Sequence, residues 1–162
     1  MSNKFTVLFD TREQHPIVFP SSEFCEGSFA TKLDTGDYTI RGYEDVVTIE
    51  RKGNVSELAK NLCEARFERE LERLNKFRFA YILCEFSLSQ VLAYPQYSNI
   101  PEYMRDKIKI SGPYILRKSI ENEMKFGVRT VFCDSSEGVR LYMTSIFKRI
   151  LEAYQRVPRN AD

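Results

Sequence analysis

Apolar residues recur along the chain in two periods, one typical of short strands and the other of amphipathic helices. Five segments are rich in β-branched and aromatic residues or form short apolar runs, and each predicts a strand. They span residues 4–9, 38–41, 46–51, 79–86 and 129–133. The run at 79–86 is continuously apolar, which indicates a strand covered on both of its faces.

Helical spacing follows several of these strands. Residues 56–77 have a helical composition, but the apolar phase changes midway, since Leu58 and Leu62 share one face and Phe67 and Leu71 share roughly the opposite one. This shift predicts two short helices with a break near residues 64–66. Strands that alternate with helices indicate an α/β fold, and the length predicts one domain over residues 1–162.

The later helices have recognisable ends. Ser111 and Pro113 open a helix that runs to about Phe126, and Gly127 closes it. Ser135 or Ser136 caps a final amphipathic helix. The segment 93–103, rich in Pro, Tyr and Asn, predicts a loop around short helices.

The hairpin register places charges together. With a four-residue loop at 42–45, Tyr38 faces Ile49, and Asp37 then stands opposite Glu50. Cross-strand Cβ atoms lie about 4.5–5.5 Å apart, so two carboxylates there repel each other. Lys52 points to the same side as Glu50, whereas Arg51 points the other way.

Two readings of this charge group are open. Two carboxylates and an ammonium suit a hard divalent cation with a nearby group that orients its water. The alternative is an ordinary cluster of exposed, solvated charges at the ends of two strands, which would show the same sequence pattern. Further acidic and basic residues lie upstream, because Asp10, Arg12 and Glu13 directly follow the strand at 4–9. Sites in α/β folds assemble at such carboxyl ends of strands.

Three motifs together resemble a known family. The chain carries D-x-R-E at residues 10–13, G-D-Y at 36–38 and E-R-K at 50–52, in that order. This combination is similar to the nuclease domain of XPF-type structure-specific endonucleases, within the PD-(D/E)xK restriction-endonuclease-like class. The resemblance implies a mixed central β-sheet flanked by helices. One departure is Ser56, where the family pattern has an aspartate, and Ser56 is a suitable helix N-cap.

The resemblance also implies roles for the motif residues. Asp37 and Glu50, with Glu13, would bind Mg²⁺ or Mn²⁺, and Lys52 would position the attacking water and help to deprotonate it. Asp10 would complete the acidic cluster, although a role in the turn is an alternative for it.

The arginines near the motifs have two readings each. Arg12 and Arg51 would pair with the carboxylates or with the scissile phosphate, which a guanidinium binds through its planar fork. Arg66, at the predicted helix break, is a candidate DNA contact or an ordinary surface residue. The stretch 105–125 is locally basic, with interleaved tyrosines, and would contact DNA or form a solvated helix face.

Net charge, cysteine spacing and hydropathy exclude several classes of protein. The 162 residues carry a formal net charge of +1, which disfavours a strong stand-alone DNA binder. The four cysteines have neither disulfide-framework nor zinc-site spacing, and no glycine-rich phosphate loop occurs. His15 is expected to be a turn residue, with a general base as the alternative. No apolar run suggests a membrane span or signal peptide, so an intracellular location is expected: cytoplasm or nucleus, or the host cytoplasm for a viral protein.

These observations predict a Mg²⁺- or Mn²⁺-dependent endodeoxyribonuclease that acts on branched or flapped DNA in repair or recombination. The alternatives are a catalytically silent domain that binds DNA or a partner, and a nuclease without structure selectivity. The motif pattern ends without the tandem helix-hairpin-helix module of larger family members. The specificity for DNA would then come from the nuclease domain itself, from a homodimer of it or from a partner protein.

Overall fold

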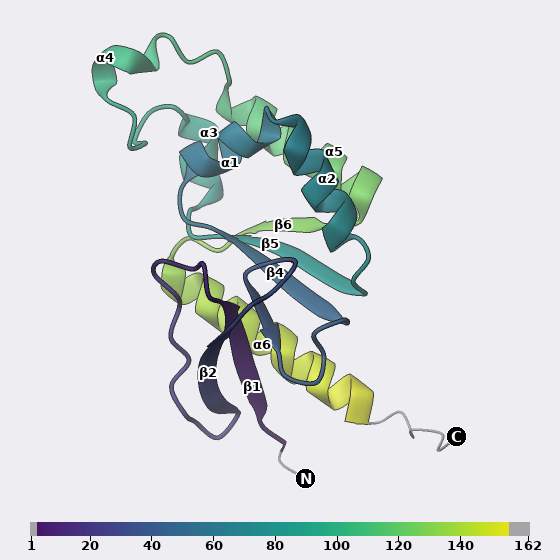
Figure 1. Cartoon of the computed structure of the whole chain (residues 1–162). Coiled ribbons are helices and arrows are strands. Elements are labelled where there is room, and N and C mark those ends of the chain that lie inside the picture. Colours follow the sequence, from purple (N-terminus) through teal and green to yellow (C-terminus); the bar gives the residue numbers. More distant parts are fainter. Residues whose placement is uncertain (1–2, 156–162) are drawn as a thin grey trace.

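The computed structural model describes residues 3–155 and has a six-stranded sheet with helices on both faces (Figure 1). The strands are β1 (Phe5–Asp10), β2 (Cys25–Thr31), β3 (Tyr38–Ile40), β4 (Val47–Lys52), β5 (Phe79–Cys84) and β6 (Arg129–Phe132). The helices are α1 (Val55–Leu62), α2 (Ala65–Leu74), α3 (Leu88–Ala93), α4 (Glu102–Arg105), α5 (Gly112–Phe126) and α6 (Ser136–Gln155).

The sheet is mixed, as the sequence predicts. Its order is β2-β1-β3-β4-β5-β6, and β3 runs antiparallel to both of its neighbours, while the other pairs are parallel. The carboxyl ends of β1, β4 and β5 therefore reach the same edge of the sheet, where β3 begins. This edge gathers the charged motifs.

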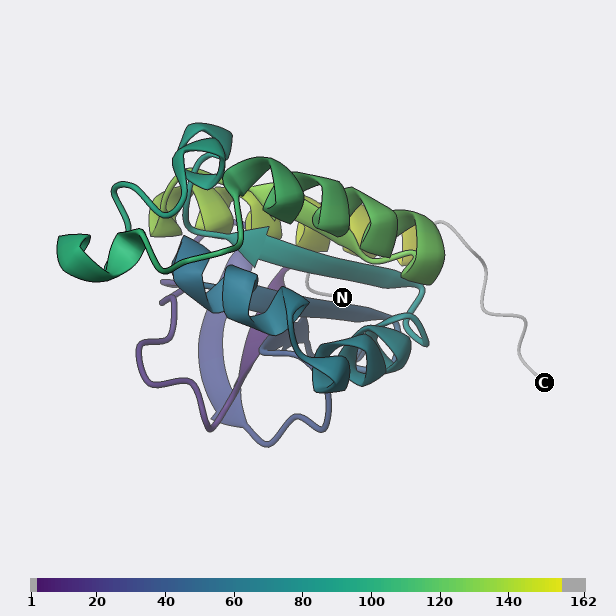
Figure 2. The ribbon, with the colours of Figure 1, turned by 90° about the horizontal axis from the view of Figure 1, so that it is seen from above.

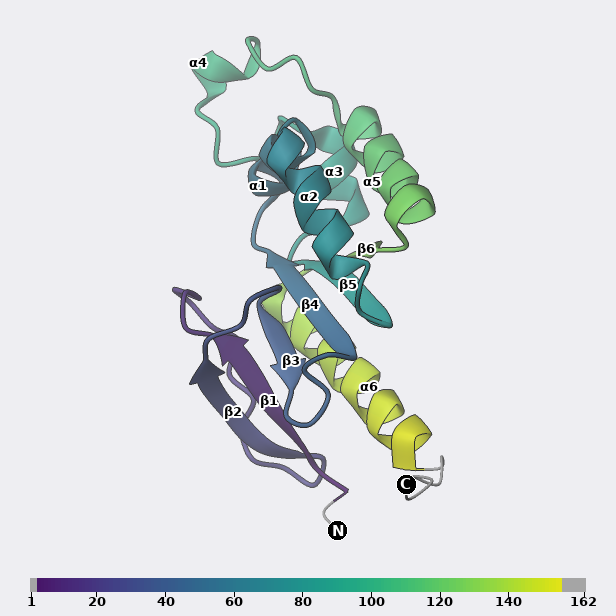
Figure 3. The same ribbon diagram turned by 45° about the vertical axis from the view of Figure 1, so that its right-hand side comes forward.

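Strand alternation divides the core into two layers. On one face, Tyr38, Ile49 and Leu83 pack with residues of α6 such as Phe147. On the other face, alternate residues of β5 such as Ile82 pack with α1, α2, α3 and α5. Figure 3 shows α6 running along the sheet and the other large helices gathered over the β4–β6 half.

The predicted helix break is confirmed, because α1 ends at Leu62 and α2 begins at Ala65. The capping prediction for Ser56 is wrong. Asn54 is the N-cap of α1, since its side chain accepts a hydrogen bond from the backbone N–H of Glu57 at 2.9 Å. Ser56 lies inside the first turn, and its hydroxyl bonds Asn99 Oδ1 at 2.7 Å.

Helices α5 and α6 have the caps that their sequences predict. Ser111 caps α5, whose C-cap Gly127 has φ +71°, a left-handed conformation that glycine adopts without strain. Ser135 Oγ accepts from the backbone N–H of Gly138 in the first turn of α6.

Strand β2 is absent from the sequence prediction. It is an edge strand with mostly half-exposed or exposed side chains, so its sequence lacks a regular alternation of apolar and polar residues. In residues 3–155, no helix is long and apolar enough to cross a membrane. The sequence prediction that no helix-hairpin-helix module follows the nuclease domain stays a prediction. It concerns the end of the sequence, where residues 156–162 lie outside the described part.

Candidate active site

A cavity of about 370 Å³ opens at the sheet edge where β1 and β4 end and β3 begins. It brings together Asp37 and Glu50 with residues that precede β3 and residues of α2. Its lining consists of Asp10, Arg12, Glu13, Asp34, Thr35, Gly36, Asp37, Glu50, Glu70 and Arg73.

The hairpin register that the sequence predicts is confirmed, because Tyr38 pairs with Ile49. The backbone N–H of Asp37 donates to Ile49 O at 2.8 Å, and the N–H of Arg51 donates to Asp37 Oδ2 at 2.7 Å. Gly36 makes this approach possible, since its φ is +77° and a Cβ there would collide with the side chain of Thr48. The chain thus fixes the Asp37 carboxylate beside β4.

Asp37 and Glu50 form an under-compensated acidic pair. Burial, together with the charge of Glu13, raises the pKa of Asp37 to about 7, although the Arg51 N–H bond opposes the rise. Burial, the charge of Asp37 and a hydrogen bond with Glu70 raise the pKa of Glu50 well above its ordinary value. Both carboxylates would be better accommodated with a cation between them.

Lys52 is the buried cation next to this pair. Its side chain is only 5% exposed, and Nζ lies 3.3 Å from Glu50 Oε1 and 3.8 Å from Glu57 Oε1. Burial lowers the pKa of Lys52, but Glu50, Glu70 and Glu57 outweigh burial, so the pKa lies above its ordinary value. Lys52 therefore stays protonated, which favours a positioning role and disfavours a role as a base.

Asp10 is already compensated. Its Oδ1 accepts from the backbone N–H of Leu33 at 3.1 Å, and its Oδ2 accepts from Arg12 Nε at 2.6 Å. Burial raises the pKa of Asp10, but these hydrogen bonds and the charge of Arg12 lower it below its ordinary value. Asp10 lines the cavity, yet its side chain joins the end of β1 to the segment between β2 and β3 through Leu33. The Arg12 side chain is 72% exposed beyond this pair.

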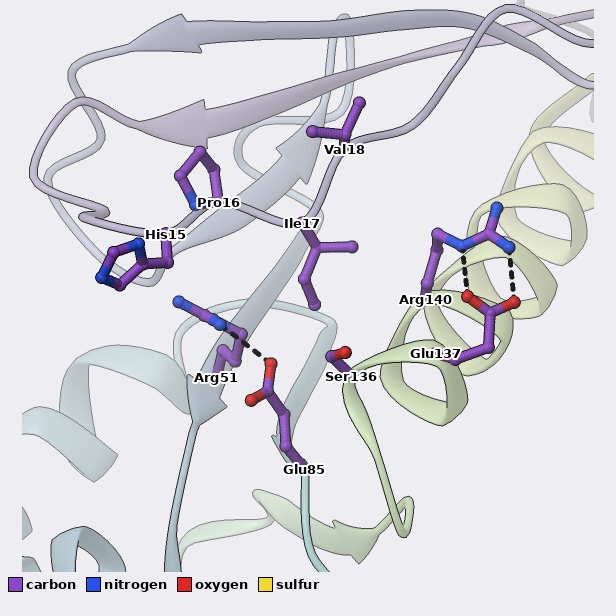
Figure 4. A pocket seen from close by; sticks show the side chains of 9 residues that line it. All are labelled: His15, Pro16, Ile17, Val18, Arg51, Glu85, Ser136, Glu137 and Arg140. Carbon is purple, nitrogen blue, oxygen red and sulfur yellow. Dashed lines mark hydrogen bonds and ion pairs between the residues drawn. The ribbon is translucent and has the colours of Figure 1, made fainter.

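Arg51 points to the opposite face of the sheet from Lys52, as strand alternation predicts. Its guanidinium forms ion pairs of 2.8 Å with both Glu13 and Glu85. Figure 4 shows this side chain in a second cavity, with His15, Ile17 and the first turn of α6 around it. Of the two readings for Arg51, the structure shows carboxylate pairing.

Glu13 lines the acidic cavity, but its carboxylate already has two hydrogen-bond donors. Its Oε2 accepts hydrogen bonds from Tyr38 Oη at 3.0 Å and from Arg51 Nε at 3.0 Å. Within residues 3–155, no group of three or more His, Cys, Asp or Glu side chains is arranged to hold a metal ion. The structure therefore brings Glu13 to the same cavity as Asp37 and Glu50, with the Glu13 carboxylate bonded to Tyr38 and Arg51.

Two cavity residues on α2 escaped the sequence prediction. Glu70 hydrogen-bonds Glu50, and Arg73 lines the cavity beside it. The sequence indicates these two residues only through their spacing, since each directly precedes a residue of the buried face of α2, which consists of Phe67, Leu71 and Leu74. Without the position of α2 over β4, that spacing could not be linked to Glu50.

Other candidates lie outside the cavity. Arg66 is exposed and pairs with Glu64, in line with a surface role. His15 lines the second cavity, with Arg51, and not the acidic one. In the basic stretch, Arg117 and Lys118 both pair with Glu121 on the solvated side of α5.

The donor set fits a hard divalent cation. Asp37 and Glu50 offer carboxylate oxygens, and their raised pKa values reflect negative charge that lacks compensation. Mg²⁺ is commonly bound by one or two carboxylates, with waters and substrate phosphates completing its shell. Two carboxylates are therefore enough for such an ion, without Glu13.

A six-stranded mixed sheet flanked by helices, with acidic residues and a lysine gathered where β1 and β4 end, defines an α/β domain with an acidic site. The model of the ERCC4 domain family matches residues 10–144, and the chain belongs to this family.

Solved structures of XPF from Aeropyrum pernix share the fold. One is 18% identical, with a TM-score of 0.59, and the match covers 93% of this chain and 65% of that one. The other, in complex with DNA, is 21% identical, with a TM-score of 0.60, and its match covers 98% and 68%. This chain thus spans about two thirds of the length of the XPF chains. No curated protein matches the sequence.

Proposed function

We propose that the protein is a metal-dependent DNA endonuclease that hydrolyses phosphodiester bonds at branched or flapped DNA. Membership of the ERCC4 domain family supports a nuclease, and the XPF neighbour in complex with DNA supports DNA as the substrate. The observation that carries the proposal is the acidic pair Asp37 and Glu50, with raised pKa values, beside the buried Lys52.

Asp37 and Glu50 would hold Mg²⁺ or Mn²⁺. Such an ion, when bound, activates water at neutral pH and neutralises charge that develops on the phosphate. The two carboxylates would position that ion, because Asp37 is held by the Arg51 N–H and Glu50 by Lys52.

Lys52 would act as a fixed cation. Its raised pKa keeps the ammonium protonated at neutral pH, and one of its three N–H donors is directed at Glu50. In this position Lys52 orients a water or a phosphate oxygen and stabilises negative charge in the transition state. Arg73, on the cavity wall, is placed to contact a flanking phosphate.

Selectivity for branched DNA would need more than this cavity. A net charge of +1 provides little general attraction to duplex DNA. We therefore propose that a second copy of the chain or a partner protein contributes to DNA binding. The exposed Leu141 and Tyr142 on α6, with Ile120 and Met124 on α5, are candidates for such a contact.

Cleavage of labelled DNA tests the proposal. Purified protein is incubated with Mg²⁺ or Mn²⁺ and a linear duplex, a flap or a four-way junction. We expect cutting of the branched forms and loss of cutting in Asp37→Asn. The matched control is Asp45→Asn, which removes one charge at the exposed opposite end of the same hairpin and should cut normally.

Three outcomes would change the proposal. Absence of cutting by the wild type favours a silent domain that binds DNA or a partner. Equal cutting of all three DNA forms favours a nuclease without structure selectivity. Cutting that survives Asp37→Asn places the active site elsewhere.

A further inference from the structure

Residues 94–111, between α3 and α5, form an arm that extends beyond the rest of the fold. Figures 1, 2 and 3 all show the part around α4 standing clear of the sheet. The Arg105 side chain holds the arm together: Nε donates to Ile100 O at 3.0 Å, and another nitrogen donates to Ser98 O at 3.5 Å. The arm therefore has a defined internal structure despite its exposure.

The arm is attached close to the end of β4. Ile100, Ile108 and Ile110 pack against the core that α1 and α5 share. Ser56, in the first turn of α1, bonds Asn99 of the arm at 2.7 Å. Because α1 begins three residues after Lys52, this bond connects the arm to the segment that leaves the acidic cavity.

Tyr97 lies at the exposed surface of this junction. Its relative exposure is 86%, and its φ of 57° is in the left-handed region, which is uncommon for a residue with a side chain. It lines a small cavity of about 120 Å³, together with Gly53 and Asn54, which directly follow Lys52. A large aromatic ring is thus kept in water next to the catalytic strand end.

The arm offers both aromatic rings and positive charge to a ligand. Residues 94–111 contain three basic residues and two acidic ones, and Lys107 and Lys109 are exposed, whereas Arg105 is bonded within the arm. Tyr103, 77% exposed, adds a second ring on the same arm. Exposed aromatic rings among basic side chains are the elements with which proteins bind single-stranded nucleic acid, by stacking and by phosphate neutralisation.

We infer that Tyr97 is a stacking platform for an unpaired nucleobase of a strand that passes the end of β4. A base inside a duplex is already stacked on both of its faces and cannot cover the ring, so the subsite favours unpaired bases over the interior of a duplex. The inference rests on the proposed function only in placing the adjoining strand in the acidic cavity. Base stacking itself requires neither the metal ion nor cleavage.

Binding in EDTA tests the inference without cleavage. Fluorescence anisotropy measures the affinity of each variant for a labelled single-stranded oligonucleotide and for a blunt duplex. Tyr97→Leu should weaken single-strand binding about tenfold, because stacking on one aromatic ring contributes roughly 1–3 kcal/mol per base. Tyr97→Phe, which keeps the ring, should bind within about twofold of the wild type, and duplex binding should be unchanged in both variants.

A matched control is Tyr103→Leu, an equally simple change on the same arm away from the small cavity. It should lower single-strand affinity by less than about threefold. A 2-aminopurine base in the oligonucleotide gives a direct readout, since stacking on Tyr97 quenches its fluorescence and Tyr97→Leu should restore it.

The two proposals can fail separately. Equal single-strand affinity of wild type and Tyr97→Leu, or equal losses in Tyr97→Leu and Tyr103→Leu, would overturn the stacking subsite even if the wild type cleaves DNA. Absence of single-strand binding by the wild type would overturn it as well and would favour a protein partner for the arm. A Tyr97-dependent affinity in a protein that cuts no DNA would keep the subsite and refute the nuclease.

Discussion

Successive residues of β4 place their charged side chains on opposite faces of the sheet, Arg51 on one and Glu50 and Lys52 on the other. Arg51, on the α6 face, forms ion pairs of 2.8 Å with two carboxylates. On the other face, Glu50 faces Asp37 and has Lys52 at 3.3 Å, and burial raises the pKa values of both acids. Close ion pairs stabilise the carboxylates on the first face, whereas the buried carboxylates on the second face cost stability until a cation compensates them. Charge removal should therefore have opposite effects on the two faces.

The largest effect is expected on the α6 face. Arg51→Met would leave the carboxylates of Glu13 and Glu85 without their cation, and breaking such a pair from one side costs about 4 kcal/mol. Urea unfolding should show this loss in metal-free protein. The double replacement Arg51→Met with Glu85→Gln should recover part of it, and an unchanged midpoint in Arg51→Met would contradict a stabilising role of these ion pairs.

The opposite sign is expected for Asp37→Asn. A rise in pKa from 3.8 to about 7 corresponds to roughly 4 kcal/mol of destabilisation as an upper value. Asparagine keeps the acceptor for the Arg51 N–H, so the metal-free variant should be about 3 kcal/mol more stable than the wild type at pH 8. Unfolding in EDTA measures the difference, and a less stable variant would refute the excess of negative charge.

The pH should control that difference. A carboxyl group with a raised pKa holds its proton more tightly in the folded state, so its destabilising effect is absent below about 3.8 and is complete only above about 7. The advantage of Asp37→Asn should thus shrink by about 2 kcal/mol between pH 8 and pH 5. Parallel unfolding curves at both pH values test this, and a constant difference would assign the gain to another cause.

The smallest effect belongs to Asp10, the compensated carboxylate of the same cavity. Its pKa is lowered, so its contribution is present above about 3.8 and is lost as the pH falls through the lower folded value. Asp10→Asn should destabilise the protein at pH 7 by about 1 kcal/mol, the typical value of one hydrogen bond. A gain like that of Asp37→Asn would remove the distinction between the two acids.

The sequence predicted those features that depend on local periodicity. The hairpin register follows from the alternation of Tyr38, Ile40, Val47 and Ile49, and it places Asp37, Glu50 and Lys52 correctly. The break between α1 and α2 follows from the apolar phase shift.

The features that were missed depend on packing between distant segments. The edge strand β2 lacks alternation because solvent covers most of its side chains. Glu70 lies beside Glu50 only through the placement of α2, and Glu13 bonds Tyr38 and Arg51, which are 25 and 38 residues away in the sequence. Asn54 replaced Ser56 as the cap because helix ends cannot be fixed to one residue from sequence.

The most direct measurement is the titration of the carboxyl carbons of Asp37 and Glu50 by NMR in metal-free protein, with Asp37→Asn for assignment. A midpoint near 7 for Asp37 is expected, and it should move to lower pH when Mg²⁺ is added. An Asp37 midpoint near 3.8 that Mg²⁺ leaves unchanged would contradict the under-compensated acidic pair and, with it, the proposed metal site.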